Sequence, residues 1–117
     1  MNGLAPTTSP AAIDGVFRAL SDPTRRSVLE RLTHGPSSVS ELAAPFEMAL
    51  PSFVEHMKTL ERAGLVASRK KGRVRTYSLV PERLRCAEDW LGRQRRLWEQ
   101  RLDQLDSYLM KMKEAEK

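Results

Sequence analysis

The chain has 117 residues, of which 40% are hydrophobic and 30% charged, values that indicate one globular domain and exclude a wholly disordered chain. Its net charge of +5 and pI of about 9.8 favour a polyanion as partner. The single cysteine, Cys86, excludes an intramolecular disulfide, and no apolar run approaches the roughly 20 residues that span a bilayer, so we expect a cytoplasmic protein.

The N-terminal half predicts three helices after a flexible tail over 1–10. Apolar residues at helical spacing indicate the first helix, over 11–20. Asp22 is expected to cap a second helix that begins near Pro23 and ends before Gly35-Pro36. Ser38 and Glu41 form a capping box for a short third helix. The expected inward-facing residues of the three helices are Ile13, Val16, Phe17, Leu20, Val28, Leu29, Leu32, Val39, Leu42 and Phe46.

A fourth helix is expected over 50–63, with Phe53, Met57 and Leu60 on its inner side and Gly64 as its C-terminal cap. The sequence leaves two possible start positions for this helix. Ala49 is a poor N-cap, whereas Ser52 with Glu55 forms a second capping box one turn later. We slightly favour the cap as the role of Glu55.

The segments 65–69 and 74–80 have strand character and flank Lys70-Lys71-Gly72-Arg73, which predicts a hairpin with glycine in its turn. Five cations lie close together here, with no acid between Glu61 and Glu82. Like charges at this density repel one another, so a negatively charged partner is expected. The cations are Arg69, Lys70, Lys71, Arg73 and Arg75.

A last helix is expected from Pro81-Glu82 to about Met112, before a flexible end over 113–117. Its final part carries apolar residues at alternating spacings of four and three, which is a heptad stripe. A domain this small cannot cover so long a helix, so part of the stripe should contact another chain. The stripe comprises Trp98, Leu102, Leu105, Leu109 and Met112.

The expected order is four helices, a basic hairpin and a fifth helix, within one domain over 11–112. This mainly helical arrangement with a small β-hairpin is typical of a dimeric winged helix-turn-helix. The segment 16–32, VFRALSDPTRRSVLERL, resembles the opening of the arsenic-repressor (ArsR) family of bacterial transcription regulators. The segments 56–66, HMKTLERAGLV, and 69–79, RKKGRVRTYSL, resemble its recognition helix and its wing.

The resemblance covers roughly residues 12–80 and implies a homodimeric DNA-binding regulator, usually a repressor. Metal-sensing members carry a cysteine pair on the helix that here reads 39–44, or metal ligands with histidine on the last helix. This chain has no cysteine in 39–44 and no histidine after His56, so we expect no metal site and no cofactor. Val54 and Glu55 also depart from the small polar residue and base often found there.

The fourth helix is the candidate for the major groove, and the hairpin cations are candidates for phosphate contact, with Arg73 or Arg75 reaching the groove. Arg25 and Arg26 contact phosphate or, in the favoured alternative, pair with acids. The expected DNA-binding residues are Leu50, Ser52, Val54, Glu55, His56, Thr59, Arg69, Lys70, Lys71, Arg73 and Arg75.

The partners expected are double-stranded DNA and a second copy of the chain, while the effector stays unknown. A two-fold dimer presents two recognition helices to successive major grooves, so the operator should be an inverted repeat. The expected dimer residues are Ile13, Phe17, Trp98, Leu102, Leu105 and Leu109.

Other function classes remain open at this point. The winged helix is alternatively a protein-interaction module, or a redox or small-molecule sensor that uses Cys86 or a pocket near Trp90. No glycine-rich phosphate loop or nucleophile motif is present, and we expect no enzyme.

Overall fold

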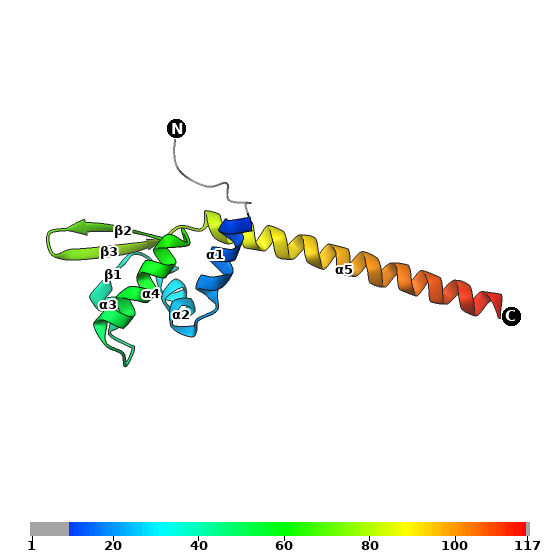
Figure 1. Ribbon diagram of the computed structural model, residues 1–117, viewed down its shortest axis with the longest axis horizontal. Coiled ribbons are helices and arrows are strands. Elements are labelled where there is room, and N and C mark those ends of the chain that lie inside the picture. The colour runs from blue at the N-terminus through cyan, green and yellow to red at the C-terminus, as the bar shows by residue number, and fades with distance from the viewer. Residues whose placement is uncertain (1–9, 117) are drawn as a thin grey trace, which may run out of the picture. The chain divides into compact units, whose positions relative to one another are not determined.

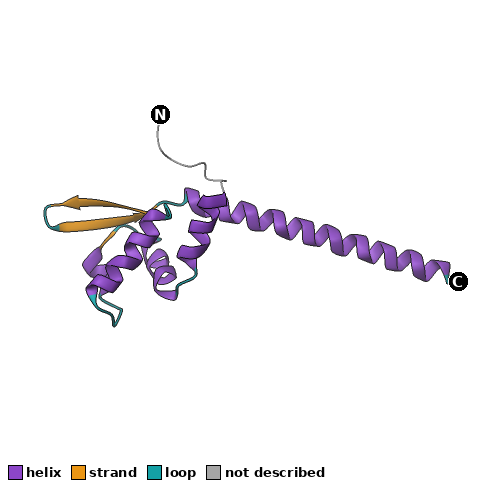
Figure 2. Ribbon diagram, viewed as in Figure 1, coloured by secondary structure: helices purple, strands orange, loops and turns teal. Residues whose placement is uncertain are grey.

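The computed structural model describes residues 10–116, so the tail expected over 1–10 lies almost wholly outside the described residues. The chain divides into two compact units, one that ends at Ala87 and one that begins at Glu88. The first unit holds the first four helices, a small sheet whose hairpin extends away from them, and the beginning of the last helix (Figures 1 and 2). The elements in order are α1 (Pro10–Leu20), α2 (Pro23–Leu32), β1 (Ser37–Ser38), α3 (Val39–Ala43), α4 (Leu50–Arg62), β2 (Val66–Lys71), β3 (Val74–Leu79) and α5 (Glu82–Ala115).

Local side-chain caps set the beginnings of α2 and α3, as predicted. The carboxylate of Asp22 accepts a hydrogen bond of 3.0 Å from the backbone N–H of Arg25, with Pro23 in the first turn of α2. At α3 the Ser38 hydroxyl accepts from the Glu41 N–H, and the Glu41 carboxylate accepts from the Ser38 N–H. At both helices, backbone donors at the N-terminus are thus satisfied by side chains that are near in sequence.

Helix α4 begins at Leu50, after Ala49. The preference for Glu55 as a cap is wrong, because the first turn forms one turn earlier, where Ser52 and Phe53 donate to the Ala49 carbonyl. The helix ends at a left-handed Gly64, φ +77°. Gly64 N–H donates to the Glu61 carbonyl and Leu65 N–H to the Leu60 carbonyl, the Schellman pattern, which turns the chain directly into β2.

The sheet has the order β1-β3-β2, and all its pairs are antiparallel. Lys71 pairs with Val74, so the hairpin closes through two residues, Gly72 and Arg73, with Gly72 at φ +63°. The strand β2 therefore continues through Lys70 and Lys71, which sequence assigned to the turn. The sequence also did not predict β1, which consists of two serines that the tertiary fold brings beside β3.

The core lies where α1, α2, α3 and α4 pack on one another and on the sheet. The expected inner side of α4 is confirmed, with Phe53, Met57 and Leu60 fully buried. Most of the other predicted inward residues are buried or partly buried at this core. The order of four helices, a hairpin and a fifth helix confirms the predicted winged helix-turn-helix.

Helix α5 has 34 residues and ends at Ala115, three residues beyond the expected Met112. Its buried residues are Cys86 and Ala87, both in the first unit. From Glu88 onward the helix forms the second unit by itself, and most of its side chains are exposed. Within residues 10–116, no helix is long and apolar enough to cross a bilayer.

Candidate nucleic-acid interface

Helix α4 presents a polar side opposite its buried one. The exposed residues are Leu50, Ser52 and Glu55, while Val54, His56 and Thr59 are half-buried. All six predicted readers are therefore on one helix, and none of them is fully buried. Such a helix fits the width of a DNA major groove, where the side chains at its beginning reach base edges.

Two of these α4 residues are already engaged within their own helix. The carboxylate of Glu55 lies 3.4 Å from the Lys58 ammonium and 4.0 Å from the guanidinium of Arg62. The Thr59 hydroxyl donates 3.0 Å to the Glu55 carbonyl. These contacts reduce the freedom of both side chains to meet a base.

His56 is held from outside α4. Its Nδ1 atom lies 3.0 Å from Nη1 of Arg25, at the beginning of α2. Arg25 also donates 2.7 Å to the Ala19 carbonyl through Nε and 2.9 Å to the Arg18 carbonyl through Nη2. One guanidinium thus joins the C-terminal end of α1 to the recognition helix.

The carboxylate of Asp22 lies beside this group, 3.7 Å from Nδ1 of His56. Partial burial acts to raise the pKa of Asp22, whereas the hydrogen bond from the Arg25 N–H and the positive charge of the Arg25 guanidinium act to lower it. The net effect lowers the pKa of Asp22 below its ordinary value of 3.8. Asp22 is therefore ionised at neutral pH.

Arg26, the next residue of α2, contacts the end of α1 in a similar way. Its Nη1 donates 2.7 Å to the Leu20 carbonyl. The sequence suggested phosphate or acids as the partners of Arg25 and Arg26; in the structure, both donate to carbonyls at the end of α1. The signal that was missed is their position directly after a helix end, where carbonyl groups lack partners.

The wing carries its five cations on two faces. The register places Lys70 opposite Arg75 and Ser68 opposite Tyr77, so these four share the face that continues into the core. Arg69 and Lys71 lie on the other face. All five cations are exposed, including Arg73 in the turn.

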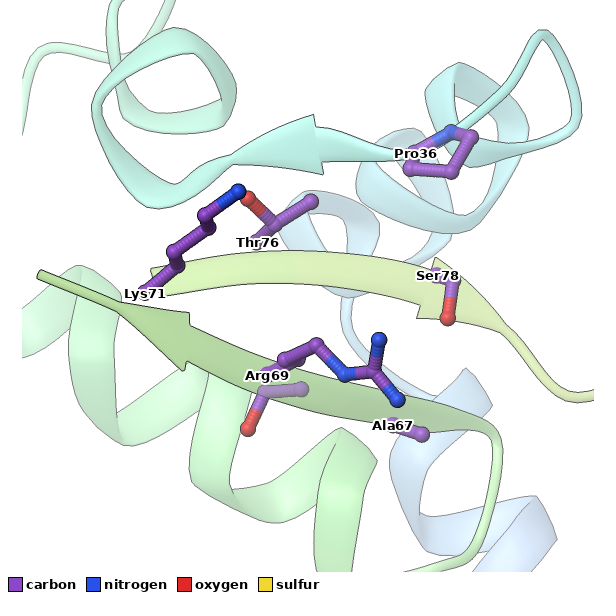
Figure 3. Close-up of a pocket in the computed structure, with 7 residues that line it drawn as sticks. Pro36, Ala67, Arg69, Lys71, Thr76 and Ser78 are labelled. Atoms are coloured by element: carbon purple, nitrogen blue, oxygen red, sulfur yellow. The ribbon is translucent and has the colours of Figure 1, made fainter. Parts of the chain in front are cut away.

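The outer face of the wing is hollowed. A cavity of about 530 Å³ is lined there by Pro36, small side chains and two cations. Figure 3 shows Arg69 and Lys71 extending over the same face as Thr76 and Ser78. Guanidinium, ammonium and hydroxyl groups all donate hydrogen bonds, so this face suits phosphate oxygens.

On the inner face, Arg75 is tied to the recognition helix. Its Nη1 donates 2.7 Å to the Ser68 hydroxyl, which donates 3.0 Å to the carboxylate of Glu61 on α4. This chain of hydrogen bonds braces the wing against α4. It directs the Arg75 side chain toward Glu61, away from the tip where Arg73 lies.

The other candidate groups differ in accessibility. Cys86 is a free and buried thiol, whereas Trp90 is 37% exposed on α5. In the part of the chain that the structure describes, no three His, Cys, Asp or Glu side chains gather in a way that could hold a metal ion.

The predicted dimer residues fall in both units. In α1, Ile13 and Phe17 are half-buried, and Phe17 packs at the edge of the core. The α5 stripe is confirmed as unburied within the single chain. Its exposed fractions are Trp98 67%, Leu102 54%, Leu105 51%, Leu109 52% and Met112 46%.

Comparisons with known proteins agree on one kind of molecule. Residues 20–69 match the model of a helix-turn-helix domain family. The chain is 41% identical over 80 residues to the HTH-type transcriptional regulator Rv2034 of Mycobacterium tuberculosis, covering 68% of this chain and 75% of that one. It is 33% identical over 79 residues to the transcriptional repressor SdpR of Bacillus subtilis, covering 68% and 88%.

Among solved structures, the crystal structure of RHA00566, an ArsR family transcriptional regulator, is similar with 50% identity and a TM-score of 0.76. The similarity covers 82% of this chain and 97% of that one.

Proposed function

Because this chain belongs to the ArsR family of winged helix-turn-helix transcriptional regulators, we propose that it represses transcription by occupying an inverted-repeat DNA operator as a homodimer. The bound dimer excludes the polymerase from the promoter by steric overlap. This function needs no catalysis and no membrane, and it is exercised on DNA in the cytoplasm.

One observation carries the DNA-binding proposal. Five exposed cations on the wing have no acid among them in 66–79, and they follow directly on a helix whose outer side is polar. Phosphates relieve the repulsion between these cations, and releasing counterions from DNA adds a favourable entropy. The wing therefore supplies affinity, and α4 supplies the choice of sequence.

The residues have separate roles in this proposal. Arg69, Lys70, Lys71 and Arg73 contact phosphates, and Arg73 at the turn is the residue free to enter the groove. Ser52 and His56 donate to base edges, while Leu50 and Val54 contact thymine methyl groups. Glu55 and Thr59 contribute mainly through contacts within α4.

Dimerisation in this proposal uses the exposed stripe of α5 together with Ile13 and Phe17 of α1. A heptad stripe is self-complementary, because its residues insert between those of an identical stripe. The relevant occupant is therefore a second copy of the chain. A two-fold pair also matches the symmetry of an inverted repeat.

We propose further that DNA binding requires no metal ion. The α3 positions that hold cysteines in metal-sensing relatives carry other residues here, from Val39 to Ala43. Operator affinity should be the same with zinc and with a chelator in titrations of the purified protein. A zinc-dependent change would assign the chain to the sensing type.

A salt series on duplex DNA tests the proposed function. The logarithm of the binding constant should fall linearly with the logarithm of salt concentration, with a slope of about −0.9 for each phosphate contacted. A slope near zero would favour the alternative of a wing that holds an acidic protein.

Lys70 and Lys71 lie on opposite faces of the wing, which makes them a matched pair. Changing either one to Ala should weaken all DNA sequences alike and reduce the slope by about one per lost contact, hence about two in a dimer. The variant that loses more DNA affinity, Lys70→Ala or Lys71→Ala, identifies the face of the wing that contacts the DNA backbone. If either change altered only the preference between sequences, the assignment of the wing to phosphate would be wrong.

A further inference from the structure

The contact between Arg25 and His56 determines which nitrogen of the His56 imidazole can carry the hydrogen. Arginine has five N–H donors and no acceptor, and its guanidinium does not lose its proton in proteins. At 3.0 Å, Nη1 of Arg25 therefore donates to Nδ1 of His56. Nδ1 must then carry a lone pair and no hydrogen.

Asp22 offers the opposite interaction, because its carboxylate would accept from a protonated Nδ1. The separation of 3.7 Å is beyond hydrogen-bond range, whereas the contact with Arg25 is within it. The same oxygen of Asp22, Oδ2, already accepts from the Arg25 N–H at 3.0 Å. The geometry thus favours the neutral imidazole, with its hydrogen on Nε2.

The hydrogen on Nε2 has no partner among the described residues. No hydrogen bond joins Nε2 to any residue within 10–116, and no side-chain nitrogen in this range is both buried and unpartnered. Nε2 is therefore accessible to solvent, on the outer part of α4. His56 presents a hydrogen-bond donor there and no acceptor.

We propose that Arg25 is a positioning residue that locks His56 as an Nε2–H donor, and that His56 consequently selects a guanine in each operator half-site. This inference rests on the proposed DNA-binding function. In the major groove, guanine presents two adjacent acceptors, N7 and O6, and no donor. Adenine and thymine each present one acceptor, and cytosine presents only a donor that would face the Nε2–H. A histidine that exchanges freely between its two tautomers could instead accept a hydrogen bond from the amino group of cytosine or adenine. Fixing the hydrogen on Nε2 excludes those two contacts.

The first experiment uses the full chain and a genomic fragment that the purified protein selects. Each guanine of one half-site is replaced in turn by 7-deazaguanine, which lacks the N7 acceptor. One replacement should weaken wild-type binding by about tenfold. The same replacement should not weaken the variant His56→Asn, whose amide oxygen can still accept from Arg25 but which has no group at the Nε2 position.

The variant His56→Gln provides the converse control, because its amide nitrogen reaches about the position of Nε2. It should keep the preference for that guanine. If every deazaguanine weakens wild type and His56→Asn equally, His56 contacts no guanine and the inference is overturned. If the wild type binds no DNA at low salt, the proposed function itself fails.

The second experiment tests the positioning role with a matched pair on α2. Arg25→Ala and Arg26→Ala each remove a cation and the hydrogen bonds it donates to the end of α1, but only Arg25 contacts His56. Nitrogen NMR of labelled histidine should show Nδ1 unprotonated in wild type and in Arg26→Ala. A mixture of tautomers, and loss of the guanine preference, should follow only in Arg25→Ala. An unchanged tautomer in Arg25→Ala would refute the lock.

Discussion

At the scale of single residues, Asp22 has several roles. It caps α2, keeps a lowered pKa and lies beside the Arg25–His56 contact. The cap could be foreseen, because Asp before Pro at a helix start is a local signal. The contact could not, because Arg25 and His56 are 31 residues apart and meet only in the folded chain.

The charge of Asp22 makes stability depend on pH in a known direction. A carboxylate whose pKa is lowered by folding stabilises the protein above its ordinary pKa, and this contribution is lost as pH falls through the folded value. The variant Asp22→Asn keeps an N-cap oxygen and removes the charge. Urea unfolding should therefore show a gap between wild type and Asp22→Asn near pH 7 that closes below about pH 4.

Asp22→Ala is the companion variant, since it removes the cap as well as the charge. It should cost about 1 kcal/mol more than Asp22→Asn in the free energy of unfolding, at acid and neutral pH alike. A gap between wild type and Asp22→Asn that does not change with pH would mean that the Asp22 charge contributes nothing to folding.

At the scale of elements, the joint between α4 and β2 determines how helix and wing are presented together. Gly64 forms this joint at φ +77°, and a Cβ added there would lie 3.0 Å from Cγ of Arg83. A side chain in the left-handed region costs roughly 1–2 kcal/mol. The tight turn therefore depends on glycine at this position.

Gly64→Ala should lower the free energy of unfolding by about 1–2 kcal/mol, as measured by urea denaturation. Gly15 is the matched control, because it lies inside α1 and an added Cβ meets nothing within 4 Å. Gly15→Ala should instead raise stability by about 0.5–1 kcal/mol. Equal effects at the two positions would show that the backbone conformation of Gly64 is not what matters.

Local signals predicted most of the elements, and their failures have a common cause. The helices α1, α2 and α3 follow from apolar spacing and capping, and the hairpin follows from Gly72 between two strand-like runs. The strand β1 has two residues, and its pairing with β3 depends on the position of distant segments. The start of α4 was ambiguous because Ser52 and Glu55 imitate a capping box inside a longer helix.

The candidate site was predictable in its outline but not in its pairings. The cations of the wing and the outer side of α4 could be assigned from charge and helical spacing. Sequence could not reveal that Arg75 is bound through Ser68 to Glu61, since the three residues lie on different elements. Side-chain partners of this kind depend on the strand register and on how the sheet packs against α4.

At the scale of the whole molecule, the second unit is a helix that cannot bury its own apolar stripe. Trp98 and Leu102 are more than half exposed. A helix of this kind is stabilised mainly by packing against another element rather than by its own propensity. The proposed dimer supplies that element, and it also doubles the number of wings and recognition helices that engage DNA at once.

Replacing Leu102 and Leu105 together by Glu tests this link between assembly and function. Both side chains are about half exposed in the single chain, so the fold of the first unit should survive. The dimer should dissociate, because four carboxylates would face one another in the stripe. Sedimentation equilibrium should then give the mass of one chain, 13.3 kDa.

The matched control is Gln100→Glu with Gln104→Glu, which adds the same charge to α5 away from the stripe. This control should remain dimeric and keep most of its affinity. The Leu102 and Leu105 double variant should lose on the order of a hundredfold in affinity for the inverted repeat. The reason is that binding of one subunit no longer holds a second subunit close to the other half-site. Its affinity for an isolated half-site should change much less. A double variant that stays dimeric, or a monomer that binds the inverted repeat as tightly as wild type, would contradict the role given to α5.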